Sequence, residues 1–163
     1  MSTAVLSIGS NIADRLGHLQ AAVDLFRPSI VAVSPVYETA PWGPVPQDDY
    51  LNAVLIVQDR SAAPRDWLDR AHAAETAARR SRGVRWGPRT LDVDVIAVDD
   101  VVSDDPVLTL PHPRAAERAF VLVPWLAVAP DARLGVTPVA ELVNSIDAID
   151  VQGVRRRRDL ELG

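Results

Sequence analysis

Apolar residues recur along the chain in two periods, and these periods predict an alternation of strands and helices. Apolar side chains three or four positions apart, as at Leu16, Leu19 and Val23, are typical of one buried helix face. Short apolar runs bounded by turn residues indicate buried strands. In chain order, we expect a strand at 4–8, a helix at 14–26, a strand at 30–33 with Val36, a strand at 51–57, a helix at 64–80, a strand at 91–98 and a helix at 115–127.

The order of these elements up to residue 98 is βαββαβ, which is the split-βαβ pattern of ferredoxin-like domains. We therefore expect an α+β fold. Its ferredoxin-like core would have helices on one face of a mostly antiparallel sheet, with C-terminal additions. Proline and glycine predict a loop at 40–49, and residues 82–88 are expected to form a basic loop.

No segment of the sequence has the composition of a linker, so residues 1–163 are expected to form a single domain. The tail at 151–163 carries a run of four arginines at 155–158, to which the sequence assigns no role. We expect these arginines, His18 and His72 to be solvated surface residues.

The composition narrows the possible classes of function. The chain has no cysteine, which excludes disulfides, thiolate catalysis and cysteine-based metal sites. It has no lysine either, so all 17 basic residues are arginines and any phosphate must be bound by arginine. The net charge of −5 argues against a general nucleic-acid surface, and no apolar run approaches the roughly 18 residues of a membrane span. We expect a cytoplasmic protein that binds neither nucleic acid nor membrane.

The most informative segment is residues 85–95, with the sequence RWGPRTLDVDV. Asp92 and Asp94 are two residues apart in an apolar run, and in a strand such residues point to the same face. Two like charges this close repel one another unless a cation lies between them. Mg²⁺ prefers carboxylate oxygens and keeps positions open for water and phosphate. Five nearby arginines could hold such phosphates through two-point contacts, namely Arg79, Arg80, Arg82, Arg85 and Arg89.

Each of these features also has an ordinary structural interpretation. A lone Asp-x-Asp pair is more often a solvent-facing part of an edge strand, and arginines often end helices because cations favour the C-terminus. Glu75 lies on a buried helix stripe, where a functional acid and an ion pair with Arg79 are equally good interpretations. Asn52 lies in an apolar strand, where a buried amide needs a partner. A phosphate contact is favoured for His112, and a stacking role for Trp86 in its polar loop.

Five short motifs follow one another along the chain: GSN (9–11), YETAPWGP (37–44), DYLN (49–52), RWGPRTLDVD (85–94) and LPHP (110–113). In this order they strongly resemble the 6-hydroxymethyl-7,8-dihydropterin pyrophosphokinase family of folate biosynthesis. The resemblance implies an ATP-dependent diphosphokinase, which is a transferase that moves diphosphate from ATP to a pterin alcohol. Its substrates would be ATP and 6-hydroxymethyl-7,8-dihydropterin, its cofactor two Mg²⁺ ions, and its expected state a monomer.

The resemblance also implies roles for individual residues. Asp92 and Asp94 match the two aspartates that bind the Mg²⁺ pair. Arg80 and Arg89 match the two catalytic arginines, although Arg79 stands where a glycine is common and could exchange roles with Arg80. The ATP-binding residues that the resemblance implies are Glu75, Arg82, Arg85, His112 and Arg118. The pterin-binding residues that it implies are Thr39, Trp42, Tyr50, Asn52, Trp86 and Phe120.

Two other functions fit parts of the pattern. An Asp-x-Asp pair could hold the metal of a nucleotide-sugar transferase, but the five arginines and the missing glycine-rich nucleotide motif argue against this activity. A nucleotide-binding regulator without catalysis would not need Asp92, Asp94 and Arg89 to be intact. Release of AMP from ATP in the presence of the pterin alcohol would separate the pyrophosphokinase from both.

Overall fold

The computed structural model describes residues 2–41, 47–80 and 90–163, except for the side chain of Arg80. Within these residues, six strands form one sheet and two short strands form another. No helix in this part of the chain is long and apolar enough to cross a membrane.

The main sheet is antiparallel at every pairing. Its strand order is β5-β1-β4-β3-β8, and β2 pairs with β4 beside β3. The strands are β1 (Ser2–Ser10), β2 (Ile30–Val33), β3 (Tyr37–Thr39), β4 (Tyr50–Asp59), β5 (Asp92–Val98) and β8 (Arg155–Arg156). The four strands expected from the apolar runs are confirmed, with β1 and β4 longer than expected. The sequence did not predict β3 or β8.

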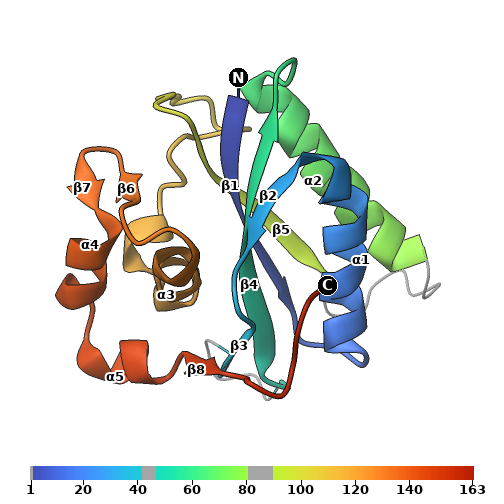
Figure 1. Cartoon of the computed structure of the whole chain (residues 1–163), viewed down its shortest axis with the longest axis vertical. Helices are drawn as coiled ribbons and strands as arrows, with labels where there is room; N and C mark the ends of the chain where they lie inside the picture. Colours follow the sequence, from blue (N-terminus) through green and yellow to red (C-terminus); the bar gives the residue numbers. More distant parts are fainter. Residues whose placement is uncertain (1, 42–46, 81–89) are drawn as a thin grey trace.

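Two helices cover one face of this sheet, α1 (Arg15–Phe26) and α2 (Pro64–Arg80) (Figure 1). The Asp14 side chain caps α1 by accepting a hydrogen bond from the Gly17 amide. A 3₁₀ turn, η1 (Arg27–Ser29), follows α1. Trp67 of α2 is fully buried, and its indole N–H donates to the Ser2 hydroxyl at 2.8 Å. Both helices were expected, and both are confirmed.

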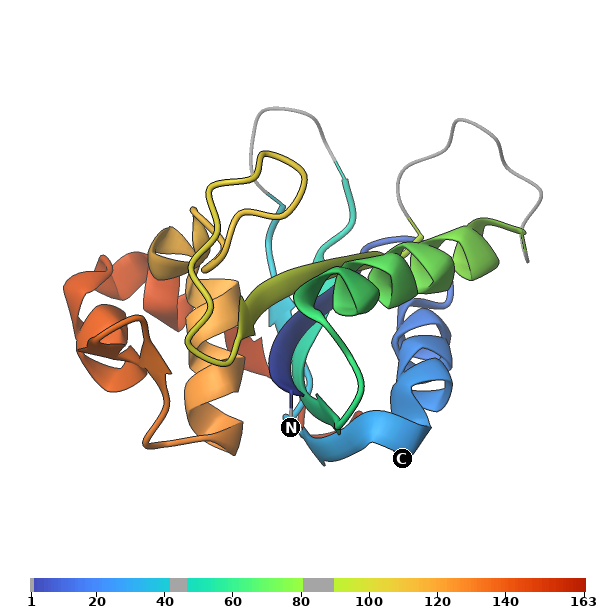
Figure 2. The ribbon, with the colours of Figure 1, turned by 90° about the horizontal axis from the view of Figure 1, so that it is seen from above.

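The helices of the expected core, α1 and α2, thus share one face, and the remaining helices, which belong to the C-terminal additions, lie on the opposite face (Figure 2). Trp125 and its neighbours on α3 pack against Val5, Val54 and Ile96 of the sheet. The expected helix at 115–127 begins as a 3₁₀ turn and becomes α-helical only at Ala119. The elements here are η2 (Ala115–Glu117), α3 (Ala119–Val128), β6 (Arg133–Leu134), β7 (Thr137–Pro138), α4 (Val139–Ser145) and α5 (Ala148–Gln152).

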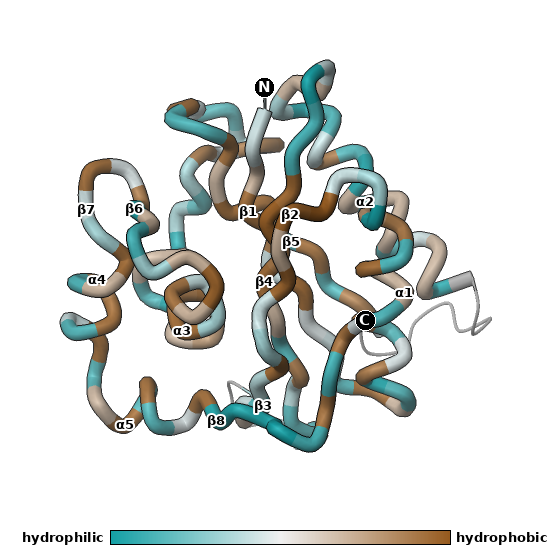
Figure 3. Tube along the Cα trace, in the orientation of Figure 1, coloured by the Kyte–Doolittle hydropathy of each residue, from teal (hydrophilic) through white to brown (hydrophobic). Residues whose placement is uncertain are grey.

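The C-terminal segment, residues 154–163, crosses from α5 to the α1 side of the sheet and is strongly polar around β8 (Figure 3). Its strand β8 pairs with β3, and the Arg157 amide donates to the Val36 carbonyl at 2.8 Å. Leu160 and Leu162 pack against the core under α1 and α2. Arg155, Arg156 and Arg158 are exposed, as expected, whereas Arg157 is partly buried and the segment is attached to β3 and to the core.

Three arginines surround the partly buried carboxylate of Glu38 on β3. Arg15 donates to it at 2.6 Å and Arg157 at 3.1 Å, while Arg155 lies 3.5 Å from its other oxygen. The hydrogen bond from Arg15, with further attraction from Arg157 and Arg155, lowers the pKa of Glu38 although burial opposes this shift. The sequence also placed His18 at the surface, but His18 is buried.

Replacing Glu38 with glutamine should lower the free energy of unfolding at neutral pH by about 2 kcal/mol, because charge-assisted hydrogen bonds are lost. The pKa of Glu38 is lower in the folded than in the unfolded state. Its carboxylate therefore stabilises the fold fully above about pH 4.5, and this contribution disappears as the pH falls through the folded-state pKa. Urea unfolding of both proteins at successively lower pH should show the difference shrinking toward zero. The exposed Glu161, changed to glutamine, is the matched control and should show no such trend.

Candidate functional site

The two aspartates of the sequence motif lie on the sheet face that is opposite α2. Because side chains alternate along β5, Asp92 and Asp94 share this face with Ile96, while Val93 and Val95 enter the core beneath α1 and α2. The shared direction that the spacing predicted for the two carboxylates is confirmed.

The neighbouring strands β1 and β4 place further small or polar residues beside Asp92 and Asp94 on this face. In the register of the sheet, Gly9 of β1 lies between Asp92 of β5 and Asn52 of β4. One pair further along β1, Ser7 lies opposite Asp94. The same face is therefore apolar where α3 covers it and polar where the sheet extends beyond α3.

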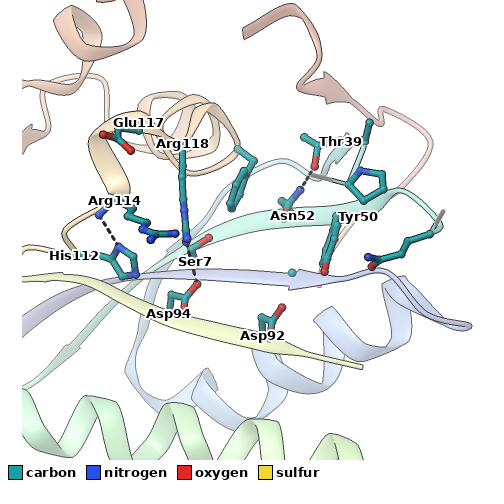
Figure 4. A pocket seen from close by; sticks show the side chains of 15 residues that line it. Ser7, Thr39, Tyr50, Asn52, Asp92, Asp94, His112, Arg114, Glu117 and Arg118 are labelled. Atoms are coloured by element: carbon teal, nitrogen blue, oxygen red, sulfur yellow. Dashed lines mark hydrogen bonds and ion pairs between the residues drawn. The ribbon is translucent and has the colours of Figure 1, made fainter. Parts of the chain in front are cut away.

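A cavity of about 650 Å³ lies over this polar end (Figure 4). It joins residues of the sheet strands β1, β3, β4 and β5 to the loop and turn that precede α3. The residues that line it are Ser7, Gly9, Thr39, Ala40, Pro41, Gln47, Tyr50, Asn52, Asp92, Asp94, His112, Arg114, Glu117, Arg118 and Phe120. Eight residues predicted from the sequence thus lie around one cavity, namely Thr39, Tyr50, Asn52, Asp92, Asp94, His112, Arg118 and Phe120.

The Asn52 amide is held in one orientation by its neighbours. Its nitrogen donates to the Thr39 hydroxyl at 2.8 Å, in the contact drawn in Figure 4. On the other side there is room only for glycine, because a Cβ at Gly9 would lie 2.9 Å from the Asn52 oxygen. Asn52 is 3% exposed, so its remaining hydrogen-bonding capacity faces the cavity rather than bulk water.

His112 is placed beside Asp94 by backbone contacts. Its amide donates to the Ile96 carbonyl at 2.8 Å, which ties the loop before α3 to β5. Pro113 has no N–H, so the Arg114 amide is the next donor along the chain, and it donates to His112 Nδ1 at 3.2 Å. With Nδ1 accepting, the neutral ring carries its proton on Nε2, where it can be donated to an anion.

Positive and negative side chains lie close together in the part of the cavity near His112. Arg118 lies 3.8 Å from the Asp94 carboxylate, and its guanidinium group lies 5.6 Å from the centre of the Phe120 ring. Burial lowers the pKa of His112, Arg118 and Arg114 lower it further, and Asp94 opposes the shift. His112 is therefore an uncharged hydrogen-bond donor at neutral pH.

The donor set fits a hard divalent cation that is only partly held by protein. Asp92 and Asp94 present carboxylates to one cavity, and nowhere in the described ranges do three or more acidic, histidine or cysteine side chains gather as a metal cage. Mg²⁺ commonly binds through one or two carboxylates and completes its shell with water and substrate phosphate. The residues present therefore fit Mg²⁺ bound together with a phosphorylated ligand.

Among the predicted site residues whose side chains the structure describes, Glu75 does not line this cavity. Glu75 lies on α2, behind the sheet, and accepts a hydrogen bond from the Val93 amide at 3.1 Å. Arg79 and Arg80 are the last described residues of α2, and Arg79 is exposed. Five predicted residues lie outside the described ranges, namely Trp42, Arg82, Arg85, Trp86 and Arg89.

The cavity also contains residues that the sequence reasoning missed. Ser7 is a polar residue within an apolar strand, and its place two residues before Gly9 could have marked it as facing the site. Arg114 directly follows the LPHP motif, and Glu117 directly precedes Arg118. No pattern in the sequence marked Gln47, which accepts a hydrogen bond from Asn11 at 2.9 Å.

An antiparallel sheet that gathers paired carboxylates, an imidazole and guanidinium groups around one cavity is typical of an enzyme that acts on phosphorylated substrates. The model of the 7,8-dihydro-6-hydroxymethylpterin-pyrophosphokinase (HPPK) family matches residues 5–130. The chain belongs to this family.

Named relatives agree with the family match. The 2-amino-4-hydroxy-6-hydroxymethyldihydropteridine pyrophosphokinase of Mycobacterium tuberculosis is 47% identical over 168 residues, which cover 95% of this chain and 89% of the relative. The enzyme of the same name from Pseudomonas aeruginosa is 42% identical over 133 residues, covering 79% of this chain and 82% of the relative.

Solved structures share the fold. The crystal structure of Plasmodium falciparum HPPK-DHPS aligns with a TM-score of 0.69 at 14% identity and covers 88% of this chain. The chain spans 44% of the length of that protein. At this identity, the likeness supports the mixed α/β fold with a mostly antiparallel sheet and nothing further.

The charges around His112 predict opposite effects of two neighbouring substitutions. Asp94→Asn should lower the pKa of His112 further, because it removes the one nearby charge that raises it. Arg118→Met should raise this pKa, because it removes a nearby positive charge. The imidazole proton signals can be followed by NMR through a pH titration and assigned with a His112→Gln variant. Shifts of the same sign in both variants would contradict the proposed electrostatics.

Proposed function

We propose that this chain transfers diphosphate from ATP to 6-hydroxymethyl-7,8-dihydropterin, giving AMP and the pterin diphosphate, with the cavity over β1, β4 and β5 as its active site. The family and its named relatives support this activity. The observation that carries the site assignment is the presence, in one cavity, of an oriented amide beside aromatic rings and of a carboxylate pair beside cationic groups.

The first half of the cavity suits the pterin ring. Asn52, oriented by Thr39, offers hydrogen bonds to the donor and acceptor edge of the ring, while Tyr50 and Phe120 supply flat apolar surfaces. Trp42 and Trp86 would add to this pocket, and their assignment rests on the sequence motifs alone.

The second half suits the triphosphate of ATP. His112 would donate from Nε2 and Arg118 from its guanidinium group to phosphate oxygens. Asp92 and Asp94 would hold two Mg²⁺ ions, which when bound supply charge neutralisation and polarisation of phosphate and hydroxyl oxygens. The sequence motifs add Arg80, Arg82, Arg85 and Arg89 on the phosphates and Glu75 on the nucleotide. Glu75 would act from the far side of β5.

The reaction is then mainly one of positioning. The hydroxymethyl oxygen of the pterin attacks the β-phosphorus of ATP in line, the bond to the bridging oxygen of AMP breaks, and the alcohol gives up its proton. The residues of the first half fix the alcohol, and those of the second half stabilise the charge that moves onto the AMP oxygen. Mixing the protein with ATP, Mg²⁺ and the pterin alcohol should give AMP and the pterin diphosphate in equal amounts, and ADP formation would exclude this reaction.

We also propose that the core is ferredoxin-like, with the second strand of the βαββαβ unit divided into β2 and β3. The strand order β5-β1-β4 followed by β2 and β3 supports this. A single domain over residues 1–163, a monomeric state and a cytoplasmic location remain predictions from the sequence.

Asp92→Asn and Asp94→Asn should each reduce turnover to less than a tenth of wild type, equivalent to at least about 1.4 kcal/mol of activation free energy. The change is isosteric and relieves the repulsion between the carboxylates, so the thermal midpoint should not fall. Asp104→Asn, at an exposed residue away from the cavity, is the matched control. A variant of either site aspartate with more than a tenth of wild-type turnover would exclude the metal role of that residue.

Thr39→Val should weaken pterin binding, while Thr39→Ser should retain most of it. Valine keeps the shape of threonine but leaves the buried Asn52 amide without its acceptor, and an unsatisfied buried group typically costs about 1–3 kcal/mol. The rise in KM should concern the pterin and not ATP. Steady-state kinetics with each substrate varied in turn would show this, and an equal rise in both KM values would contradict the division of the cavity.

A further inference from the structure

The wall of the pterin half of the cavity is formed by β3 and the start of β4. Thr39 and Tyr50 are paired across these strands and share the cavity face. Glu38, one residue before Thr39, is paired with the buried Leu51 and lies on the opposite face of the sheet. Charged groups that bind Glu38 therefore act on this wall from behind, without entering the cavity.

Two arginines from distant parts of the chain each connect the two strands of this wall. Arg15, at the start of α1, donates to the Glu38 carboxylate at 2.6 Å and to the Asp49 carbonyl at 2.9 Å. Arg155, in β8, lies 3.5 Å from the other Glu38 oxygen and donates to the Asp49 carboxylate at 3.1 Å. Glu38 directly precedes Thr39 and Asp49 directly precedes Tyr50, so each arginine ties the neighbours of two cavity residues together.

Few other contacts hold β3 in place in the sheet. The pairing of β3 with β4 comprises three residue pairs, and strands this short contribute little order by themselves. The outer edge of β3 is paired with β8 through only two residue pairs. Arg157 adds a third cation on Glu38 and a backbone bond to Val36. The spacing of Thr39 and Tyr50 thus depends on groups that lie behind the sheet.

We propose that Arg15 and Arg155 form a clamp that holds the Glu38 end of β3 against the Asp49 end of β4 and so positions Thr39, Asn52 and Tyr50 for the pterin. Arg15 and Arg155 are positioning residues, since neither side chain lines the cavity in which the substrate would bind. Through Arg155, the C-terminal segment becomes part of the substrate site. This inference rests on the proposed function for the identity of the ligand, but the geometry of the clamp can be tested without it.

The clamp has a matched control within β8 itself. Arg156 lies next to Arg155, is exposed and pairs with Tyr37 through its backbone. The variant Arg156→Gln therefore loses the same charge as Arg155→Gln and retains the strand pairing, but it leaves the contacts of the clamp intact. Arg155 is 58% exposed, and exposed ion pairs contribute little to stability. Arg155→Gln should therefore fold normally, with a thermal midpoint equal to that of Arg156→Gln.

The decisive experiment measures pterin binding in the presence of Mg²⁺ and α,β-methylene-ATP, together with steady-state kinetics. Arg155→Gln should weaken pterin binding several-fold, and Arg15→Gln combined with Arg155→Gln should weaken it at least about tenfold, or 1.4 kcal/mol. The affinity for the ATP analogue and kcat at saturating pterin should remain near wild type. Arg155→Lys should recover only part of the affinity, because an ammonium group makes a single compact contact. Pterin affinity equal in Arg155→Gln and Arg156→Gln, or an equal loss for both substrates, would overturn the clamp.

A second readout separates the clamp from the reaction. The side-chain amide signals of Asn52 report its hydrogen bond to Thr39 and can be followed by NMR in the free protein. They should shift in Arg155→Gln and remain in place in Arg156→Gln. If the wild-type protein formed no AMP from the pterin alcohol, the proposed function would fail, whereas unchanged Asn52 signals in the double variant would overturn the clamp alone.

Discussion

The alternation of side chains along β1, β4 and β5, with one register shift where Val5 and Leu6 pair with β5, is the constraint on which the rest of the molecule depends. On the face away from α1 and α2, each of these strands carries apolar side chains at one end and polar side chains at the other. Val5, Val54 and Ile96 pack against α3, while Asp94 and Asn52 line the cavity beside it. A shift of one residue in the β1–β5 register would turn the carboxylates into the core, so burial of the valines fixes the direction of the charges.

The docking of α3 is therefore as important to the site as the sheet is. The loop that precedes α3 runs along β5, and the bond from the His112 amide to the Ile96 carbonyl holds it there. Phe120, in the first turn of α3, then closes the cavity over the polar rows, with Arg118 just before it. Apolar packing of Trp125 on the sheet is what brings these groups to the carboxylates, although none of the apolar residues takes part in chemistry.

The sequence predicted the elements that show a regular stripe or an apolar run and missed the two shortest strands of the main sheet. The helices α1 and α2 and the strands β1, β4 and β5 each bury a regular stripe, so their pattern is visible in the sequence alone. The strand β3 has three residues, and β8 has two arginines, so neither shows any period. They form because partners from elsewhere in the chain pair with them, which is tertiary information. The residues missed in the cavity, such as Arg114, were adjacent to a recognised motif but carried no pattern of their own.

The arginines of the C-terminal segment have partners that the pattern of charge along the sequence does not reveal. A run of arginines is normally solvated, because ordering such side chains loses entropy and exposed pairs return little. Here Arg155, Arg156 and Arg158 are exposed, but Arg155 and Arg157 also reach the partly buried Glu38, whose carboxylate remains charged with the help of cationic partners. Glu38 and the arginines of the C-terminal segment that contact it, Arg155 and Arg157, are more than a hundred residues apart in sequence, so neither segment predicts the other. Motifs therefore locate the groups that meet the substrate, whereas the support that fixes their geometry comes from contacts that only the folded chain reveals.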